Sequence, residues 1–336
     1  MTAAPHAASS SSLWRRLNRR EFWVLLLLIV TVAAVSVKNP NFCQLSNIRN
    51  MLANAAPTAI VACGVTLVIV TGEIDISVGS LMGLLAAVLG ATSSLVYSRW
   101  PAAASIVLVL TLGTAIGLVN GLLVTFGRVP SIVVTLGTMM ALLGVTKLFL
   151  TGYGDSIDVS RCSPALIWLD KGTVLLIPVA IWIALAVIAA TIFLVCMMPL
   201  GRHIYAVGSN PHAAMLAGLS RQRVKLFVFA LTGLLVGLAT IVRVPQLAKV
   251  ESSIGQGLEL LVVTCVVVGG TSISGGRGTI AGSVLGVLLL NSVGSMLLFL
   301  RLGENATYWE QAIQGVFILV AVLADHLARR RHGDTA

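Results

Sequence analysis

The sequence predicts an all-α, polytopic membrane protein with about ten transmembrane helices and both termini in the cytoplasm. Of its 336 residues, 57% are hydrophobic and only 10% are charged, whereas soluble domains carry roughly 25% charged residues. Apolar stretches of about 20 residues, long enough to cross a hydrocarbon core of about 30 Å, recur along the chain. Basic residues gather near both ends, and an even number of spans then places both ends on the cytoplasmic side.

The apolar runs define the expected spans. The first is expected to be retained rather than cleaved as a signal peptide, because nine more follow and no clean A-x-A site is present. The eighth is short and is either broken or re-entrant. The expected spans are residues 22–38, 52–71, 78–97, 102–125, 130–150, 173–198, 224–243, 257–270, 279–300 and 308–326. They form one membrane domain, 22–326, between a disordered cytoplasmic tail, 1–21, and a basic cytoplasmic tail, 327–336.

The net charge of +10 does not indicate a nucleic-acid partner, because the basic residues favour the expected inner side of the membrane. The five cysteines and the pair His203 and His212 show no ligand spacing, so no metal site is expected. The polar stretches are too short for a soluble enzyme domain. The basic residues expected in the inner loops are Arg128, Arg202, Arg221, Arg223, Lys225 and Arg277.

The run GEIDISVGS, residues 72–80, places two carboxylates between apolar stretches. Ionisable groups near a span are expensive and are functional candidates. One interpretation is structural, with Ser77 or Asp75 capping the third span near its positive end. A second is a gate or coupling role, and a third, hydrogen bonding to sugar hydroxyls, requires a deeper loop. The candidate residues of this motif are Glu73, Asp75, Ser77, Gly79 and Ser80.

A glycine-rich stretch, GGTSISGGRGTIAG, occupies residues 269–282. It lacks the lysine of a phosphate-binding loop, so we expect a tight turn and close helix approach instead. Residues 66–83 align with 264–282, with one inserted residue. This match indicates either a parallel internal repeat or a chance similarity between glycine-rich segments. The candidate glycines are Gly270, Gly275, Gly276 and Gly278.

The polar segment 199–225 contains a short expected helix. Asn210 is a favourable N-cap, Pro211 suits the first helical position, and Gly218 can end the helix in a left-handed conformation. An exposed face of small and flexible residues is expected, which indicates docking of a cytoplasmic partner rather than a simple connector. That face comprises Ala213, Ala214, Met215 and Ala217.

Three polar residues within the spans, Asn120, Thr135 and Asn291, are candidates for a translocation path. The alternative is hydrogen bonding between helices, which is common for such residues.

Taken in order, these motifs resemble the permease subunits of bacterial ABC sugar importers of the ribose type. The resemblance covers residues 40–326. It is most specific at 54–80, 129–138, 201–220 and 255–282, which read NAAPTAIVACGVTLVIVTGEIDISVGS, VPSIVVTLGT, GRHIYAVGSNPHAAMLAGLS and GQGLELLVVTCVVVGGTSISGGRGTIAG. It implies a non-catalytic, multi-pass subunit of the bacterial inner membrane that imports a small monosaccharide, such as rhamnose or a ribose-like sugar, or autoinducer-2.

The resemblance also implies the partners of such a subunit. These are a cytoplasmic ATPase that binds ATP and Mg, a second permease copy or paralogue, a periplasmic sugar-binding protein and membrane lipid, with no cofactor on this chain. Outer loops 151–172 and 244–256 would receive the binding protein. The implied ATPase-coupling residues are Gly201, Arg202, Gly208, Asn210, Pro211, Ala213, Ala214 and Gly218.

The alternative function is a stand-alone secondary transporter or channel. In that case Glu73, Asp75 or Glu259 would bind a coupling proton or ion.

Overall fold

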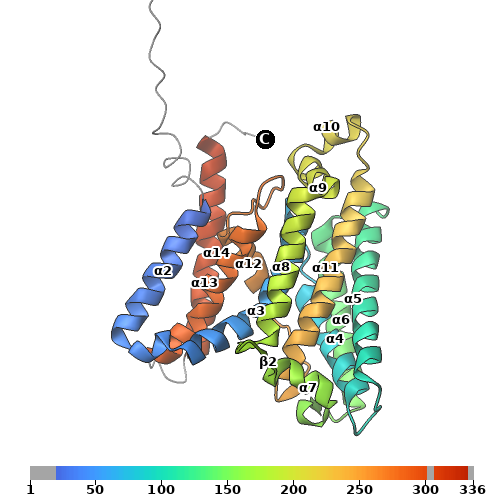
Figure 1. Ribbon diagram of the computed structural model, residues 1–336. Coiled ribbons are helices and arrows are strands. Elements are labelled where there is room, and N and C mark those ends of the chain that lie inside the picture. The colour runs from blue at the N-terminus through green and yellow to red at the C-terminus, as the bar shows by residue number, and fades with distance from the viewer. Residues whose placement is uncertain (1–19, 301–305, 332–336) are drawn as a thin grey trace, which may run out of the picture.

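The computed structural model describes residues 20–300 and 306–331, so most of the expected N-terminal tail and half of the expected C-terminal tail lie outside the described residues. These residues form an all-helical polytopic bundle (Figure 1). The helices are α2 (Arg20–Lys38), α3 (Leu45–Val70), α4 (Val78–Ser93), α5 (Ala102–Thr125), α6 (Ser131–Thr151), α7 (Pro164–Lys171), α8 (Val179–Met197), α9 (Pro199–Ser209), α10 (Pro211–Leu216), α11 (Arg221–Arg243), α12 (Leu258–Val268), α13 (Ile280–Phe299) and α14 (Ala306–Arg331).

Seven of the described helices, α2, α3, α5, α6, α8, α11 and α13, are long and apolar enough to cross a membrane. The apolar helices α4 and α12 are shorter. At 1.5 Å per residue, the 16 residues of α4 and the 11 of α12 extend only about 24 Å and about 16 Å, less than the hydrocarbon core of about 30 Å. Both therefore depend on non-helical segments that continue into the bundle.

Helix α3 lies at the centre of the bundle, where every residue from Ala55 to Val70 is buried. Helix α11 packs against α3, and α5 packs against α11 so closely that their backbones touch. A Cβ at Gly117 would lie 3.1 Å from the Cα of Gly233, and Gly113 touches the same residue. Small residues spaced by four thus allow two helix backbones to meet.

The two ends of the bundle differ. Helices α9 and α10 lie at one end, together with the start of α2 and the end of α14, whereas α7 lies at the other (Figure 1). Near α7, strand β1 (Ser156–Asp158) pairs antiparallel with β4 (Lys249–Glu251). Strand β2 (Thr173–Val174) pairs with β3 (Ile177–Pro178).

The four strands were not predicted from the sequence, because ladders of two or three residues are too short to show an alternating pattern. The β1–β4 pairing nevertheless joins the two segments, 151–172 and 244–256, that the sequence assigned to one side of the membrane.

Candidate functional site

Two helices that enter the bundle end in the same backbone motif. After α3, the N–H of Gly72 donates to Ile69 O and that of Glu73 donates to Val68 O. After α12, Gly270 and Thr271 donate in the same way to Val267 O and Val266 O. Both glycines have a left-handed conformation, with φ of +80° and +100°. This is the Schellman arrangement, and its recurrence at aligned positions supports the internal repeat.

The loops that follow are the acid loop, residues 72–77, and the glycine loop, residues 270–278. The start of the acid loop meets Gly275 and Gly276 of the glycine loop. The N–H of Gly276 donates to Val70 O at 2.8 Å, and a Cβ at Gly275 would lie 2.9 Å from Gly72 N. A Cβ at Gly208, near the end of α9, would overlap Val70 O. We call these five residues, Val70, Gly72, Gly208, Gly275 and Gly276, the loop junction.

Helix α9 is fixed to the glycine loop by a second contact. The hydroxyl of Tyr205 donates to Gly278 O at 2.6 Å, and burial raises the pKa of this tyrosine. The phenol therefore keeps the proton that it donates. At the start of α9, Gly201 packs against the Val195 backbone of α8, where a Cβ would overlap. Arg202, the next residue, is exposed.

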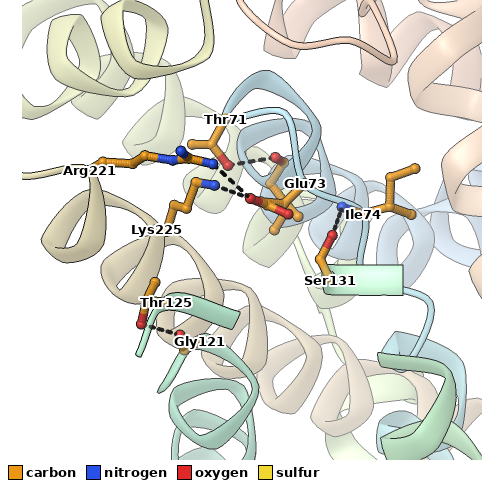
Figure 2. A network of polar contacts seen from close by, with 9 residues as sticks. Thr71, Glu73, Ile74, Gly121, Thr125, Ser131, Arg221 and Lys225 are labelled. Carbon is orange, nitrogen blue, oxygen red and sulfur yellow. Dashed lines mark hydrogen bonds and ion pairs between the residues drawn. The ribbon is translucent and has the colours of Figure 1, made fainter. Parts of the chain in front are cut away.

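The acid loop is fixed to α11 by charge. Lys225 forms an ion pair with Glu73, and a guanidinium nitrogen of Arg221 lies 4.0 Å from the same carboxylate oxygen (Figure 2). The side chains of Lys225 and Glu73 are only 5% and 12% exposed. A nearly buried ion pair of this kind depends on both partners, because removal of one leaves an uncompensated charge.

Asp75 lies deeper and begins a chain of hydrogen bonds. Its carboxylate accepts from the N–H and hydroxyl of Ser77 at 2.9 and 2.6 Å. The Asn120 amide then donates to Ser77 Oγ at 3.0 Å, and the Thr138 hydroxyl donates to Asn120 Oδ1 at 2.7 Å. This chain connects the acid loop to α5 and α6.

The first turn of α6 holds the acid loop from another side. The N–H of Ile74 donates to Ser131 Oγ at 3.1 Å (Figure 2). The Thr135 hydroxyl lies 3.3 Å from Ile74 O. Ser77 occupies the N-cap position of α4, one of the two residues proposed for that role, but its side chain makes no capping hydrogen bond. Its hydroxyl donates instead to Asp75, which also accepts from the N–H of Ser77.

Close backbone contact continues along α4. A Cβ at Gly79 would overlap Gly255 O and the carboxylate of Glu259, and one at Gly83 would lie 2.7 Å from Ile254 O. Ser80 donates to Ser77 O at 2.9 Å. The segment after β4 therefore descends beside α4, and Glu259 stands in the first turn of α12 rather than within a long span.

Helix α10 was largely predicted. Asn210 accepts from Ala213 N at 2.9 Å, Pro211 is the first helical residue, and Gly218 has a φ of +80°. The exposed face differs from the expected one. Ala214 is buried because it packs into the bundle, whereas Leu216, not named from the sequence, is 76% exposed beside the exposed Met215.

Comparison with known proteins decides the family. A family model described as branched-chain amino acid transport system / permease component matches residues 47–322. The chain belongs to this permease family. The resemblance to permease subunits of ABC importers is therefore confirmed, and the permease is a non-catalytic transport component of a multi-pass type.

Individual relatives match nearly the full length of the permease. The ribose import permease protein RbsC of Escherichia coli (strain K12) is 37% identical over 90% of this chain and 92% of its own. The probable ABC transporter permease protein YphD of the same strain is 35% identical, over 93% and 91%. The autoinducer 2 import system permease protein LsrC of Yersinia pseudotuberculosis serotype O:1b (strain IP 31758) is 33% identical, over 92% and 85%. No solved structure matches the permease.

The three polar residues expected to line a translocation path, Asn120, Thr135 and Asn291, lie in two different places. Asn120 and Thr135 are buried in the contacts around the acid loop, whereas Asn291 lines a distant cavity. Glu310 of α14 lines the same cavity and was missed. Glu310 could have been identified from the sequence, because it is a carboxylate within the expected span 308–326. Helix α9 was also missed, because its polar residues read as a loop.

Proposed function

We propose that this permease is the transmembrane subunit of an ATP-driven importer of a small monosaccharide or autoinducer-2, in the bacterial inner membrane. The observation that carries the proposal is the loop junction, where Gly208 at the end of α9 touches both Val70, immediately before the acid loop, and Gly276 of the glycine loop. Such a contact gives a cytoplasmic partner a short mechanical route into the bundle. Similarity to ribose and autoinducer 2 permeases over about nine-tenths of the chain supports the cargo class.

In this proposal the ATPase binds α9 and α10. The exposed side chains of Met215 and Leu216 form an apolar docking face, which Asn210, Pro211 and Gly218 hold in place. ATPase closure displaces α10 and α9 together. The implied coupling residues Gly201, Arg202, Gly208, Ala213 and Ala214 position these helices against the bundle or at the docking surface.

The acid loop acts as the gate. Glu73 is held by Lys225 on α11, and Asp75 by Ser77, which in turn accepts from Asn120. Displacement of α9 acts on Val70, immediately before this loop, and on Gly276 and Gly278 of the glycine loop. Both loops thus change position in the same step, which is the requirement of alternating access.

The proposed topology has ten crossings and both termini in the cytoplasm, with α4, α12 and α14 completing the seven longer spans. The end of the bundle that carries β1, β4 and α7 then faces the periplasm and receives the sugar-binding protein. A second permease copy or paralogue lies beside the exposed apolar helices, and the ATPase supplies ATP and Mg.

Reconstitution tests the function. The permease is co-purified with its ATPase, incorporated into liposomes with ATP inside, and supplied with binding protein and radiolabelled D-ribose outside. We expect accumulation that requires all three proteins and ATP, with autoinducer-2 tested as the second cargo. Accumulation by the permease alone under a proton or sodium gradient would overturn the proposal in favour of a secondary transporter. The pairing of Glu73 with Lys225 argues against a free ion-coupling carboxylate at that position.

A further inference from the structure

A cavity of about 730 Å³ lies between α3, α12, α13 and α14, near the end of α11. Its volume falls within the range of about 300–1,000 Å³ typical of small-molecule sites. Amide side chains dominate its polar lining. They are Asn54, Gln256, Asn291, Gln311 and Gln314.

The cavity has two charged side chains on its lining, Arg243 and Glu310, and their charges are opposite. An anion or cation would therefore find no net compensating charge. Amides offer both donors and acceptors, which suits hydroxyl groups. This composition selects a neutral, polyhydroxylated molecule over a charged or an apolar one.

Several of the polar groups are free to bind a ligand. Within the described residues, the side chains of Asn54 and Gln311 have no hydrogen-bond partner, and both are exposed. Asn291 uses its amide nitrogen to donate to Val287 O at 3.0 Å, which leaves its carbonyl oxygen available. Polar side chains would be costly against lipid tails, so they indicate a water-accessible space.

The wall of the cavity contains a proline that was not singled out in the sequence. Pro57 lies inside α3 and has no N–H to donate to Ala53 O. The Gln246 amide donates to that carbonyl instead, at 3.1 Å. Gln246 in turn accepts from Arg243 at 3.3 Å. Hydrogen bonds through Gln246 thus connect the α3 backbone beside Pro57 to Arg243, the cationic side chain of the cavity lining.

The cavity lies near the last residue of α11, away from the end of the bundle that carries α9 and α10 (Figure 1). Arg221 begins the 23-residue helix α11 beside the gate, and Arg243 ends it, about 33 Å away at 1.5 Å per residue. Ile254 and Gly255 line the cavity and also touch Gly83 and Gly79 of α4. Helix α4 begins directly after the acid loop, so the cavity wall contacts the helix that the proposed gate leads into.

We propose that this cavity is the outward-facing site that receives the substrate, a neutral molecule of monosaccharide size held by the amides and by Glu310 and Arg243. The inference rests on the proposed import function and names the residues that perform it. Neutral hydroxyls exchange readily between these amides and water, so the site holds the substrate weakly enough to release it when the gate opens.

The first test compares Asn291→Leu and Gln314→Leu with Gln44→Leu, an exposed amide outside the cavity. Each complex is reconstituted as above and supplied with D-ribose-loaded binding protein. We expect the cavity variants to lower uptake by about tenfold, while ATP hydrolysis stimulated by loaded binding protein and uptake by the control stay at wild-type levels. If wild-type permease transports and the cavity variants match it, the cavity inference is overturned while import stands. If the wild type does not transport, the proposed function fails instead.

A second test does not depend on transport. Gln311→Cys is made in a permease whose exposed Cys43 and Cys196 are replaced by serine, and a membrane-impermeant thiol reagent is added to cells with a permeabilised outer envelope. We expect modification that high D-ribose slows. Leu319→Cys, two turns along α14 and 65% exposed, should not react because it faces lipid. An unreactive Gln311→Cys, or equal reaction at both positions, would overturn the inference.

Discussion

The acid loop and the glycine loop begin with the same left-handed glycine and the same pair of backbone hydrogen bonds, yet their side chains hold different neighbours. The acid loop carries Glu73 and Asp75, which bind α11 and, through Ser77 and Asn120, α5 and α6. The glycine loop has no carboxylate and binds α9 through Gly276 and Gly278.

The same backbone conformation at a helix end therefore leads into two loops with different contacts. Because the glycine loop lacks bulk, the end of α9 can approach until Gly208 touches Val70. The acid loop instead fills its surroundings with polar contacts that fix its position. A displacement of α9 would therefore first change its contacts with the glycine loop. It would then act on the acid loop, which the Glu73–Lys225 ion pair holds in place.

The largest expected effect comes from Gly208→Val. A Cβ at this position would overlap the oxygen of Val70. Because this oxygen belongs to the backbone, no side-chain rotation can relieve the overlap. We expect loss of the folded complex, measured as loss of the monodisperse peak in size-exclusion chromatography. Gly137→Val is the matched control, because nothing lies within 4 Å of its added Cβ. A normal peak for Gly208→Val would contradict the close contact.

Leu216→Asp should abolish ATPase assembly and uptake while leaving the permease folded. Leu216 is 76% exposed on α10, so the substitution removes apolar docking area without disturbing the interior. Co-purification of the ATPase and thermal unfolding are measured together. Leu216→Met, which keeps the apolar surface, should retain assembly. Normal assembly by Leu216→Asp would remove α10 from the proposed interface.

Asn120→Leu tests the deeper contacts of the acid loop. It removes the donor to Ser77 and the acceptor for Thr138 in a buried position, which should cost about 1–3 kcal/mol. Thermal unfolding of the purified permease reports this loss. Thr111→Val is the control, since its exposed hydroxyl only bonds to its own helix. Equal stability of the two variants would show that the chain from Asp75 to α6 contributes nothing.

Tyr205→Phe should have the smallest effect, because it removes one hydrogen bond to Gly278 O, worth about 1 kcal/mol. We expect uptake to fall severalfold while stability changes little. Burial raises the pKa of Tyr205, so the phenol stays protonated at and above neutral pH and this contact should not make uptake pH-dependent there. Wild-type uptake by Tyr205→Phe would show that α9 does not act through the glycine loop.

Local sequence signals predicted much of this molecule. The apolar runs located the long helices, although α3 begins seven residues before the expected span 52–71 and α8 begins six residues after the start of the expected span 173–198. Asn210, Pro211 and Gly218 act at α10 as their backbone preferences require. The match of Gly72 with Gly270 reflects a shared helix end. These features depend on a residue and its close neighbours in the chain.

The missed features depend on contacts between distant residues. Burial of Ala214, the Glu73–Lys225 pair across 152 positions and the link from Ser77 to Asn120 arise only when helices pack. Glu310 could have been singled out as a carboxylate in an expected span, but the sequence does not show which cavity it lines. The short strands have no sequence period of their own.

A double-mutant cycle on Glu73 and Lys225 tests most directly whether the acid loop is locked to α11 by charge. Stability and uptake are measured for Glu73→Gln, Lys225→Met and the double variant. Each single change should destabilise the permease by about 3–5 kcal/mol, since it strands a nearly buried charge. The double variant should lose less than the sum, with a coupling energy of about 1–3 kcal/mol, and uptake should fall in all three. Additive stabilities together with normal uptake would show that this pair is neither a lock nor part of the gate.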